Sequence, residues 1–173
     1  MYQLFPYPRC MAETRWLDDQ ESRTWRDFLS MSKQLLSQLG AELQRETGLS
    51  AADYEVLVNL SEATDGRLRP SELGAAIRWE KSRLSHHVSR MEQRGLVKRS
   101  ACKTDARGAF VAITAAGRRA IEKAAPEHVE QVRRVFFDAL TPTQLDALNE
   151  ISEAVLRKLD ECPQDAAPCP TDC

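Results

Sequence analysis

Residues 70–114 read PSELGAAIRWEKSRLSHHVSRMEQRGLVKRSACKTDARGAFVAIT. Proline is favoured in the first turn of a helix, so Pro70 predicts the start of a short helix over residues 71–77. Glycine often ends a helix, so Gly95 predicts the end of a second helix over residues 80–94. The two predicted helices are joined by a tight turn, which is the arrangement of a helix-turn-helix.

The end of the same stretch predicts a β-hairpin. Residues 96–103 and 108–114 flank a polar turn and have the composition of two strands. Leu68, just before the stretch, is expected to form a strand of one or two residues. A helix-turn-helix followed by a hairpin is a winged helix-turn-helix. The sequence therefore predicts a mainly α fold with a small β wing, in the α+β class.

Positive charge is concentrated in this module. Residues 67–107 contain eleven Lys and Arg residues against four acidic ones, a local balance of +7. The whole chain of 173 residues has a formal charge of −2, so the residues outside this range carry −9. A nearly neutral protein with one basic module is typical of contact with a polyanion at that module. We therefore predict double-stranded DNA as a partner.

The helix expected over residues 80–94 has one apolar and one polar side. Leu84, Val88 and Met91 lie four and three residues apart and form the predicted buried stripe. The opposite side carries hydroxyl, imidazole and guanidinium groups, which suit base edges and phosphates. The alternative is an ordinary solvent-exposed face, but such faces more often mix Glu and Lys.

Positions on this helix indicate individual roles. Lys81 and Arg83 lie near the N-terminus, where the helix dipole also attracts phosphate, and Arg83 also suits a guanine. His86 is the next predicted base reader, whereas His87 lies nearer the apolar stripe and is expected to be packed more often than to bind a ligand. Trp79 is expected to anchor the turn. The predicted DNA-binding residues of the two helices are Arg69, Ser71, Lys81, Ser82, Arg83, Ser85, His86, Ser89 and Arg90.

The tip of the hairpin predicts a second DNA contact. Lys103, Asp105 and Arg107 are the candidate residues there. An arginine at such a tip suits the negative potential of a narrow minor groove. Asp105 is expected to orient the Arg107 guanidinium through a hydrogen bond. A solvated turn with an incidental ion pair is the alternative.

Helical patterns flank the module on its N-terminal side. Residues 16–47 repeat apolar side chains at spacings of three and four. Ser50 is expected to cap another helix that ends near residue 63. The inner face of that helix is expected to consist of Tyr54, Leu57, Val58 and Ser61.

Two more helices are expected on the C-terminal side. Thr114 predicts the N-cap of the first, and Pro126 should kink or divide it. Thr141, Pro142 and Gln144 predict the start of the second. The apolar residues expected on the first are Ile121, Ala124, Ala125, Val129, Val132, Val135 and Phe136, and those on the second are Leu145, Leu148, Ile151, Val155 and Leu159.

The terminal helices carry more apolar surface than one small winged module could cover, which predicts a homodimer held by helices from both chain ends. The predicted organisation is a mobile tail (1–14), a dimerisation helix (15–48), a winged helix-turn-helix DNA-binding domain (49–114), dimerisation helices (115–161) and a disordered tail (162–173).

Composition excludes several classes of protein. No apolar run approaches the roughly 18 residues that span a bilayer, and the first ten residues lack the features of a signal peptide. A cytoplasmic protein without a membrane partner is therefore predicted. The five cysteines are an odd number and are expected to be free thiols. Metal-ligand spacing, phosphate loops and catalytic arrangements are not recognised, so no metal, cofactor, catalytic residue or enzymatic activity is predicted.

Five short strings occur along the chain in a fixed order. They are LRPSEL (68–73), KSRLS (81–85), MEQRGLV (91–97), DARG (105–108) and ITAAG (113–117). In order and spacing they resemble the MarR family of bacterial winged helix-turn-helix transcriptional regulators, over about residues 25–159.

This resemblance implies a homodimeric repressor on a pseudo-palindromic operator. The recognition helices would enter successive major grooves and the wings would touch flanking minor grooves. The resemblance also implies release from DNA when a small anionic or phenolic effector binds between the dimer helices and the winged module. By position, Trp25, Phe28 and Tyr54 are the candidate effector contacts.

Two other interpretations stay open. Cys102 lies beside Lys98, Arg99 and Lys103, surroundings that favour a reactive thiolate, so a thiol-based redox-sensing regulator is one alternative. A winged helix used as a protein-interaction module is the other. Such a module would more often expose Leu, Phe or Tyr on its recognition helix.

Overall fold

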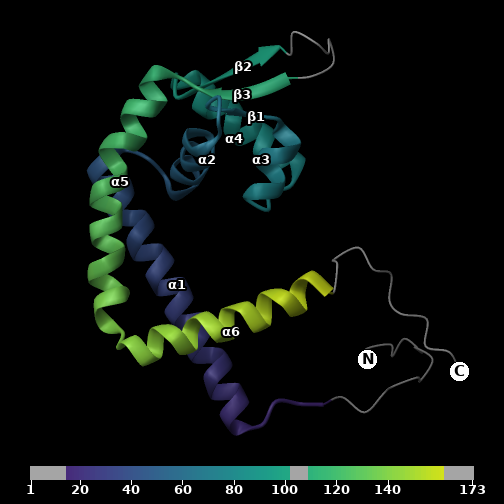
Figure 1. Cartoon of the computed structure of the whole chain (residues 1–173), viewed down its shortest axis with the longest axis vertical. Coiled ribbons are helices and arrows are strands. Elements are labelled where there is room, and N and C mark those ends of the chain that lie inside the picture. Colours follow the sequence, from purple (N-terminus) through teal and green to yellow (C-terminus); the bar gives the residue numbers. More distant parts are fainter. Residues whose placement is uncertain (1–14, 102–108, 162–173) are drawn as a thin grey trace, which may run out of the picture. The chain divides into compact units, whose positions relative to one another are not determined.

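The computed structural model describes residues 15–101 and 109–161 (Figure 1). The chain divides after Ser37, within its first helix, into two units that are described separately. The fold is mainly helical with one small sheet, as the sequence predicts. The elements in chain order are α1 (Asp19–Thr47), α2 (Ala51–Glu62), β1 (Arg67–Leu68), α3 (Pro70–Ala76), α4 (Lys81–Gln93), β2 (Val97–Ala101), β3 (Ala109–Ile113), α5 (Ala115–Val135), the 3₁₀ turn η1 (Phe137–Ala139) and α6 (Pro142–Glu161).

The three strands form one antiparallel sheet in the order β1-β3-β2. Val97 pairs with Ile113 between β2 and β3, and Leu68 pairs with Val111 between β1 and β3. Val97 and Val111 are buried, so one face of the sheet packs on the core. The predicted hairpin and the short strand at Leu68 are confirmed.

Helix starts follow the capping signals in the sequence. The Ser50 hydroxyl accepts the N–H of Asp53 at 3.1 Å, and the Asp53 carboxylate accepts the N–H of Ser50 at 3.0 Å. Thr114 caps the first turn of α5, and Thr141 and Gln144 cap each other at the start of α6. Caps of this kind contribute about 1 kcal/mol each by satisfying N–H groups that have no partner within the helix.

The core lies under the helix-turn-helix and the sheet. It takes residues from the end of α1 and the first half of α5 as well as from the module between them, so both flanking helices help to bury it. Burial of a Leu, Val or Met side chain stabilises the fold by roughly 1.5–3 kcal/mol. The buried apolar residues are Leu43, Leu49, Val56, Leu57, Leu60, Leu73, Ile77, Leu84, Val88, Met91, Leu96, Val97, Val111, Ile121 and Ala124.

The inner face predicted for α2 is incomplete. Leu57 is buried and Tyr54 and Val58 pack against the core, but these two and Ser61 are only partly buried, and other positions of the helix are more deeply enclosed. The physical reason is that α2 packs against α3, α5 and the sheet at once, so its buried surface is wider than one stripe. The buried residues of α2 are Asp53, Val56, Leu57 and Leu60.

Of the two outcomes expected for Pro126, a kink or a division of its helix, the structure shows a bend and no division. α5 runs from Ala115 to Val135 without interruption, and Figure 1 shows that its axis bends along the way. A proline removes one hydrogen bond and crowds one turn, which bends a helix that is held at other points. Ile121 and Ala124 pack in the core just before the proline, and Gln131 donates to Glu42 after it.

Large apolar faces stay exposed in this single chain. α6 has no buried residue, and Val129, one of the apolar residues of α5, is 55% exposed. None of the helices in the described ranges is long and apolar enough to cross a membrane. The large exposed side chains of α6 are Ile151, Val155, Leu156 and Leu159, and those of residues 15–37 are Trp16, Leu17, Trp25, Phe28, Leu29, Met31 and Leu36.

Gly117 provides a test of how α5 is seated on the sheet. A Cβ at this position would overlap the carbonyl oxygen of Leu96, a backbone atom that cannot move independently of β2. We expect Gly117→Ala to lower the free energy of unfolding by roughly 1–3 kcal/mol, measured by urea denaturation. Gly40→Ala is the matched control, because its Cβ would make an ordinary 3.7 Å contact with Ala51. In mid-helix that change should raise stability by up to about 1 kcal/mol. Equal stability of the Gly117 variant and the wild type would contradict the close approach.

Candidate nucleic-acid interface

α4 turns its apolar stripe inward and its polar side outward. Leu84, Val88 and Met91 are buried, as the sequence predicts. His87 is buried as well, so the expectation that it is packed is confirmed. Ser89 is half-buried. The predicted DNA-binding residues that α4 exposes are Lys81, Ser82, Arg83, Ser85, His86 and Arg90.

Trp79 anchors the turn between α3 and α4. Its backbone N–H donates to the carbonyl of Gly74 at 2.9 Å, and its half-buried indole packs against the core. The indole and the His87 ring meet edge to face, with ring centroids 5.2 Å apart. The Arg83 guanidinium lies 4.2 Å from the centre of the indole ring. This cation–π contact restricts Arg83 to one flank of α4.

A second aromatic residue organises the N-terminus of α3. Phe110 on β3 lies beneath the guanidinium groups of Arg67 and Arg69, at 4.9 Å and 5.3 Å from the ring centre. Arg69 is a predicted DNA contact, and Ser71 is exposed in the next turn. Sequence reasoning missed Phe110 and Arg67, because the contact depends on β1 and β3 being neighbours in the sheet.

Arg99 of β2 fastens the wing to α4. Its guanidinium donates to the Glu92 carboxylate at 2.8 Å, to the carbonyl of Ser85 at 3.2 Å and to the hydroxyl of Ser89 at 2.9 Å. The Ser89 hydroxyl in turn donates to the carbonyl of Ser85 at 2.9 Å. The structure thus places a predicted DNA contact, Ser89, in an internal network. Arg99 itself was missed by sequence reasoning, since no local pattern pairs it with α4.

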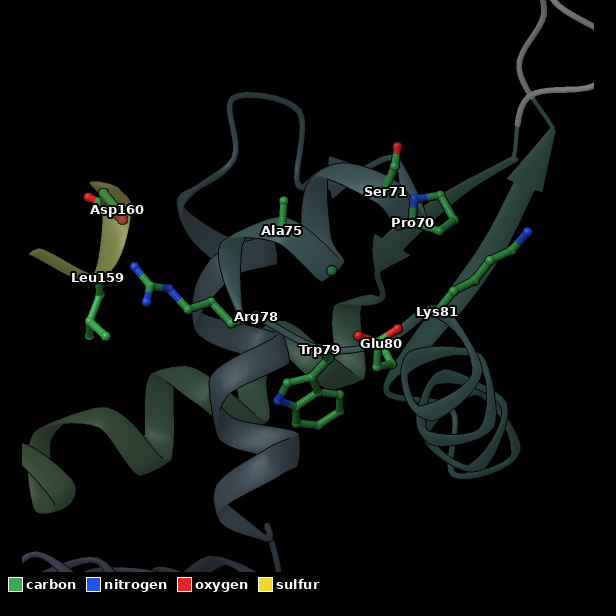
Figure 2. Close-up of a pocket in the computed structure, with 10 residues that line it drawn as sticks. Pro70, Ser71, Ala75, Arg78, Trp79, Glu80, Lys81, Leu159 and Asp160 are labelled. Atoms are coloured by element: carbon green, nitrogen blue, oxygen red, sulfur yellow. The ribbon is translucent and has the colours of Figure 1, made fainter. Parts of the chain in front are cut away.

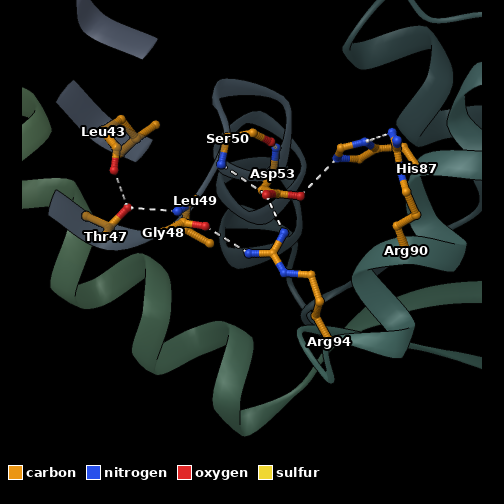
Figure 3. Close-up of polar contacts among 9 residues, drawn as sticks. All are labelled: Leu43, Thr47, Gly48, Leu49, Ser50, Asp53, His87, Arg90 and Arg94. Atoms are coloured by element: carbon orange, nitrogen blue, oxygen red, sulfur yellow. Dashed lines mark hydrogen bonds and ion pairs between the residues drawn. The ribbon is translucent and has the colours of Figure 1, made fainter. Parts of the chain in front are cut away.

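A polar cluster around the buried side chains of Asp53 and His87 lies on the other flank of α4. Asp53, His87, Arg90 and Arg94 meet here, beside the junction of α1 and α2 (Figure 3). Burial would raise the pKa of Asp53, but hydrogen bonds from Arg94 and Ser50 outweigh it and hold that pKa below its ordinary value. Burial lowers the pKa of His87, with Asp53 opposing the shift. The residues lining the adjoining cavity of about 630 Å³ are Gln44, Gly48, Ser50, Ala52, Asp53, Trp79, Arg83, His87, Arg90 and Arg94.

Another cavity, of about 710 Å³, lies beside the α3–α4 turn (Figure 2). Ser71 and Lys81, both predicted DNA contacts, line it together with residues of the turn and the end of α6. In Figure 2, Arg78 points toward the segment with Leu159 and Asp160, whereas Lys81 points away from it. The mixed lining has no catalytic arrangement.

The candidate effector residues fall in two separate units. Trp25 and Phe28 stack on each other within residues 15–37, with ring centroids 5.8 Å apart and about half of each side chain exposed. Tyr54 packs against His128 of α5, with centroids 4.5 Å apart. Burial lowers the pKa of His128 and raises the pKa of Tyr54. The cavities described above are lined by other residues.

Several predicted sites cannot be placed. The wing tip, with Lys103, Asp105 and Arg107, lies outside the described residues, and so does Cys102 of the redox alternative. Within ranges 15–101 and 109–161, no three His, Cys, Asp or Glu side chains are grouped as ligands for a metal ion.

Comparisons with known proteins agree on one family. A family model described as MarR family matches residues 47–108. The crystal structure of AbsC, a MarR family transcriptional regulator from Streptomyces coelicolor, is 42% identical, with a TM-score of 0.80 over 86% of this chain and 99% of AbsC. Sco3205, a MarR family transcriptional regulator from the same organism solved in complex with DNA, is 38% identical, with a TM-score of 0.82 over 90% and 96% of the two chains. The transcriptional repressor MprA of Escherichia coli (strain K12) is 24% identical over 146 residues, 84% of this chain and 82% of MprA.

Proposed function

Because this chain belongs to the MarR family of transcriptional regulators, which are not enzymes, we propose that it is a homodimeric repressor that binds a pseudo-palindromic operator. The single observation that carries the proposal is the outer face of α4. It exposes Lys81, Arg83 and Arg90 and has no acidic residue in its first turn. The 38% identical relative Sco3205 was solved in complex with DNA. We further propose that the protein binds DNA in the cytoplasm.

The proposed interface has three parts. α4 would lie in the major groove with Arg83 and His86 toward base edges, while the N-terminus of α3 contacts the backbone. The wing would reach the minor groove. The proposed DNA contacts are Arg69, Ser71, Lys81, Ser82, Arg83, Ser85, His86, Ser89, Arg90, Lys103, Asp105 and Arg107.

Selection of bound fragments from genomic or random DNA tests this proposal and would supply the operator. Six to ten phosphate contacts per dimer would make log affinity fall with log salt with a slope of about −5 to −9. Arg83→Gln should weaken operator binding by roughly 1–3 kcal/mol, measured by fluorescence anisotropy. Arg119→Gln removes the same charge from an exposed position of α5 and should have a much smaller effect. Failure to recover any fragment at low salt would end the proposal.

The exposed apolar faces support the homodimer. Soluble monomers rarely expose large contiguous apolar patches, and α6 alone presents Ile151, Val155, Leu156 and Leu159 to solvent. A second copy of the chain would cover such a face in a helical interface. A two-fold dimer would also account for a pseudo-palindromic operator, because its two recognition helices would read matching half-sites.

Light scattering after size exclusion tests the dimer. The wild type should have about twice the 19.5 kDa mass of the chain. Val155→Glu places a charge on the apolar face of α6 and should shift the mass toward that of one chain. Arg157→Glu places a glutamate two residues further along, on the side of α6 that faces away from Val155, and should stay dimeric. A monomeric wild type at micromolar concentration would refute the assembly.

We further propose that a small anionic or phenolic effector releases the protein from DNA, with Trp25, Phe28 and Tyr54 as contacts. Aromatic side chains with exposed faces suit such a ligand, and Trp25 and Phe28 present a stacked pair. The His128 ring beside Tyr54 has a buried Nδ1 without a partner among the described residues. That atom is a polar group that a ligand could satisfy.

A panel of small phenols and aromatic carboxylates tests the effector. A compound that lowers operator affinity of the wild type should be about tenfold less potent on Trp25→Ala and Tyr54→Ala, because each loses an aromatic contact of about 1.4 kcal/mol. Trp16→Ala removes a strongly exposed tryptophan outside α1 and serves as the control. Unchanged potency on both variants would exclude these contacts.

A further inference from the structure

A continuous chain of polar contacts ties α4 to the junction of α1 and α2 (Figure 3). It starts at the carbonyl of Gly48, which ends α1, and passes through Arg94 to the carboxylate of Asp53. From Asp53 it continues through His87 to Arg90. We call these contacts the Asp53 clasp. They hold α4 at two places, in its middle and at its C-terminal cap.

Asp53 is the centre of the clasp. Its side chain is only 3% exposed, and carboxylates are rarely buried to this degree unless they are paired. Its Oδ2 accepts from Arg94 Nη1 at 2.6 Å and from the Ser50 N–H at 3.0 Å. Its Oδ1 lies 3.1 Å from Nε2 of His87. Both oxygens are therefore occupied, one by the α2 cap and Arg94 and the other by α4.

The partners of His87 define its tautomer. A guanidinium has only donors, and Arg90 Nη2 lies 3.1 Å from Nδ1 of His87, so Nδ1 accepts. The proton of the neutral ring is then on Nε2, which faces the Asp53 carboxylate. That contact is electrostatic rather than a well-aligned hydrogen bond, since Nε2 has no hydrogen-bond partner of regular geometry among the described residues. His87 thus contacts both Asp53 and Arg90, so the position of the Arg90 side chain depends on that of Asp53.

Arg94 makes the second attachment. Its side chain is about half exposed, but two of its nitrogens reach buried or backbone acceptors. Nη1 donates to the Asp53 carboxylate, and Nη2 donates to the carbonyl of Gly48 at 2.9 Å. The planar guanidinium of an arginine can donate to two acceptors in a fixed geometry, which the ammonium group of a lysine cannot do. Rotation of α4 about its axis would break this contact and the His87 contact together.

We propose that Asp53 is a positioning residue for DNA recognition, which it serves by setting the orientation of α4 through Arg94 and His87. This inference rests on the proposed DNA-binding function. Buried ion pairs often add little to stability, and their best-attested use is to specify one arrangement. A recognition helix needs such specification, because its side chains must meet base edges within a fraction of an ångström.

A purely electrostatic role and a positioning role of Asp53 predict opposite changes in operator affinity for Asp53→Asn. The variant removes one negative charge from the DNA-binding module, so Coulomb attraction alone would tighten binding to any duplex. Loss of orientation would instead weaken binding to the operator. Asparagine can keep the oxygen that accepts from Ser50 and Arg94, so the α2 cap persists, but it loses the charge that pairs with Arg94 and places an N–H donor against the Nε2 proton of His87.

The experiment measures affinities of the full-length protein for the selected operator and for an unrelated duplex of equal length. Asp53→Asn should lose operator affinity by about tenfold or more, comparable to one mismatched base pair, while affinity for the unrelated duplex stays equal or rises. Asp65→Asn is the matched control, because it removes an exposed acidic charge from the same module. It should bind both duplexes as tightly as the wild type or more tightly.

Arg94→Lys is the second variant and keeps the charge. It should lose operator discrimination with an unchanged salt slope, and the double variant should be no worse than the poorer single one. Circular dichroism and thermal unfolding establish folding at the assay temperature, and if Asp53→Asn is unfolded there, Arg94→Lys decides. Wild-type discrimination in a folded Asp53→Asn or in Arg94→Lys would overturn the inference. A wild type that binds neither duplex would instead refute the proposed function.

Discussion

Burial of three side chains of α4 determines which of its faces meets solvent. Leu84, Val88 and Met91 are enclosed by the core, so a rotation of the helix would expose them at a cost of roughly 1.5–3 kcal/mol each. Their burial leaves Ser82, His86 and the flanking cations pointing outward. Contacts to the neighbouring elements then refine the orientation. Arg99 attaches one flank to the wing, and the Asp53 clasp attaches the other to the α1–α2 junction.

The charge of the module has two uses. Arg94, Arg99 and Arg67 pair with Asp53, Glu92 and Asp65, and so act as links within the module. Lys81 and Arg83, by contrast, lie exposed near the N-terminus of α4. The local balance of +7 therefore does not measure the number of groups that can meet phosphate. It indicates the location of a polyanion site, while the structure distinguishes internal cations from outward ones.

Local signals predicted the fold well. Ser50 and Thr114 cap helices, the spacing of Leu84, Val88 and Met91 orients α4, and β2 and β3 pair where two strands are expected. The errors have a common cause in tertiary context. The full buried surface of α2 could not be identified because α3, α5 and the sheet surround that helix.

The links within the candidate site could not be predicted for a related reason. Arg94 and Asp53 are 41 residues apart, and Arg67 reaches Phe110 only through strand pairing. No local periodicity of the sequence connects residues that lie so far apart along the chain. Asp53 also fits the pattern of an ordinary capping residue, which concealed its second role. The residues at the wing tip stay predictions.

The attachment of Arg94 to Gly48 has a particular consequence because its acceptor is a backbone carbonyl. The last carbonyls of a helix have no partner within it, so the end of α1 offers an acceptor whatever side chains surround it. Gly48 adopts a φ of +72°, which ends α1. Its carbonyl therefore moves with the end of the helix rather than with a rotatable side chain. A displacement of residues 38–48 would reach α4 directly through one guanidinium, and Asp53 would oppose it by holding the same guanidinium from α2. The orientation of α4 thus depends on agreement between the end of α1 and the start of α2, two elements joined by a short and well-capped turn.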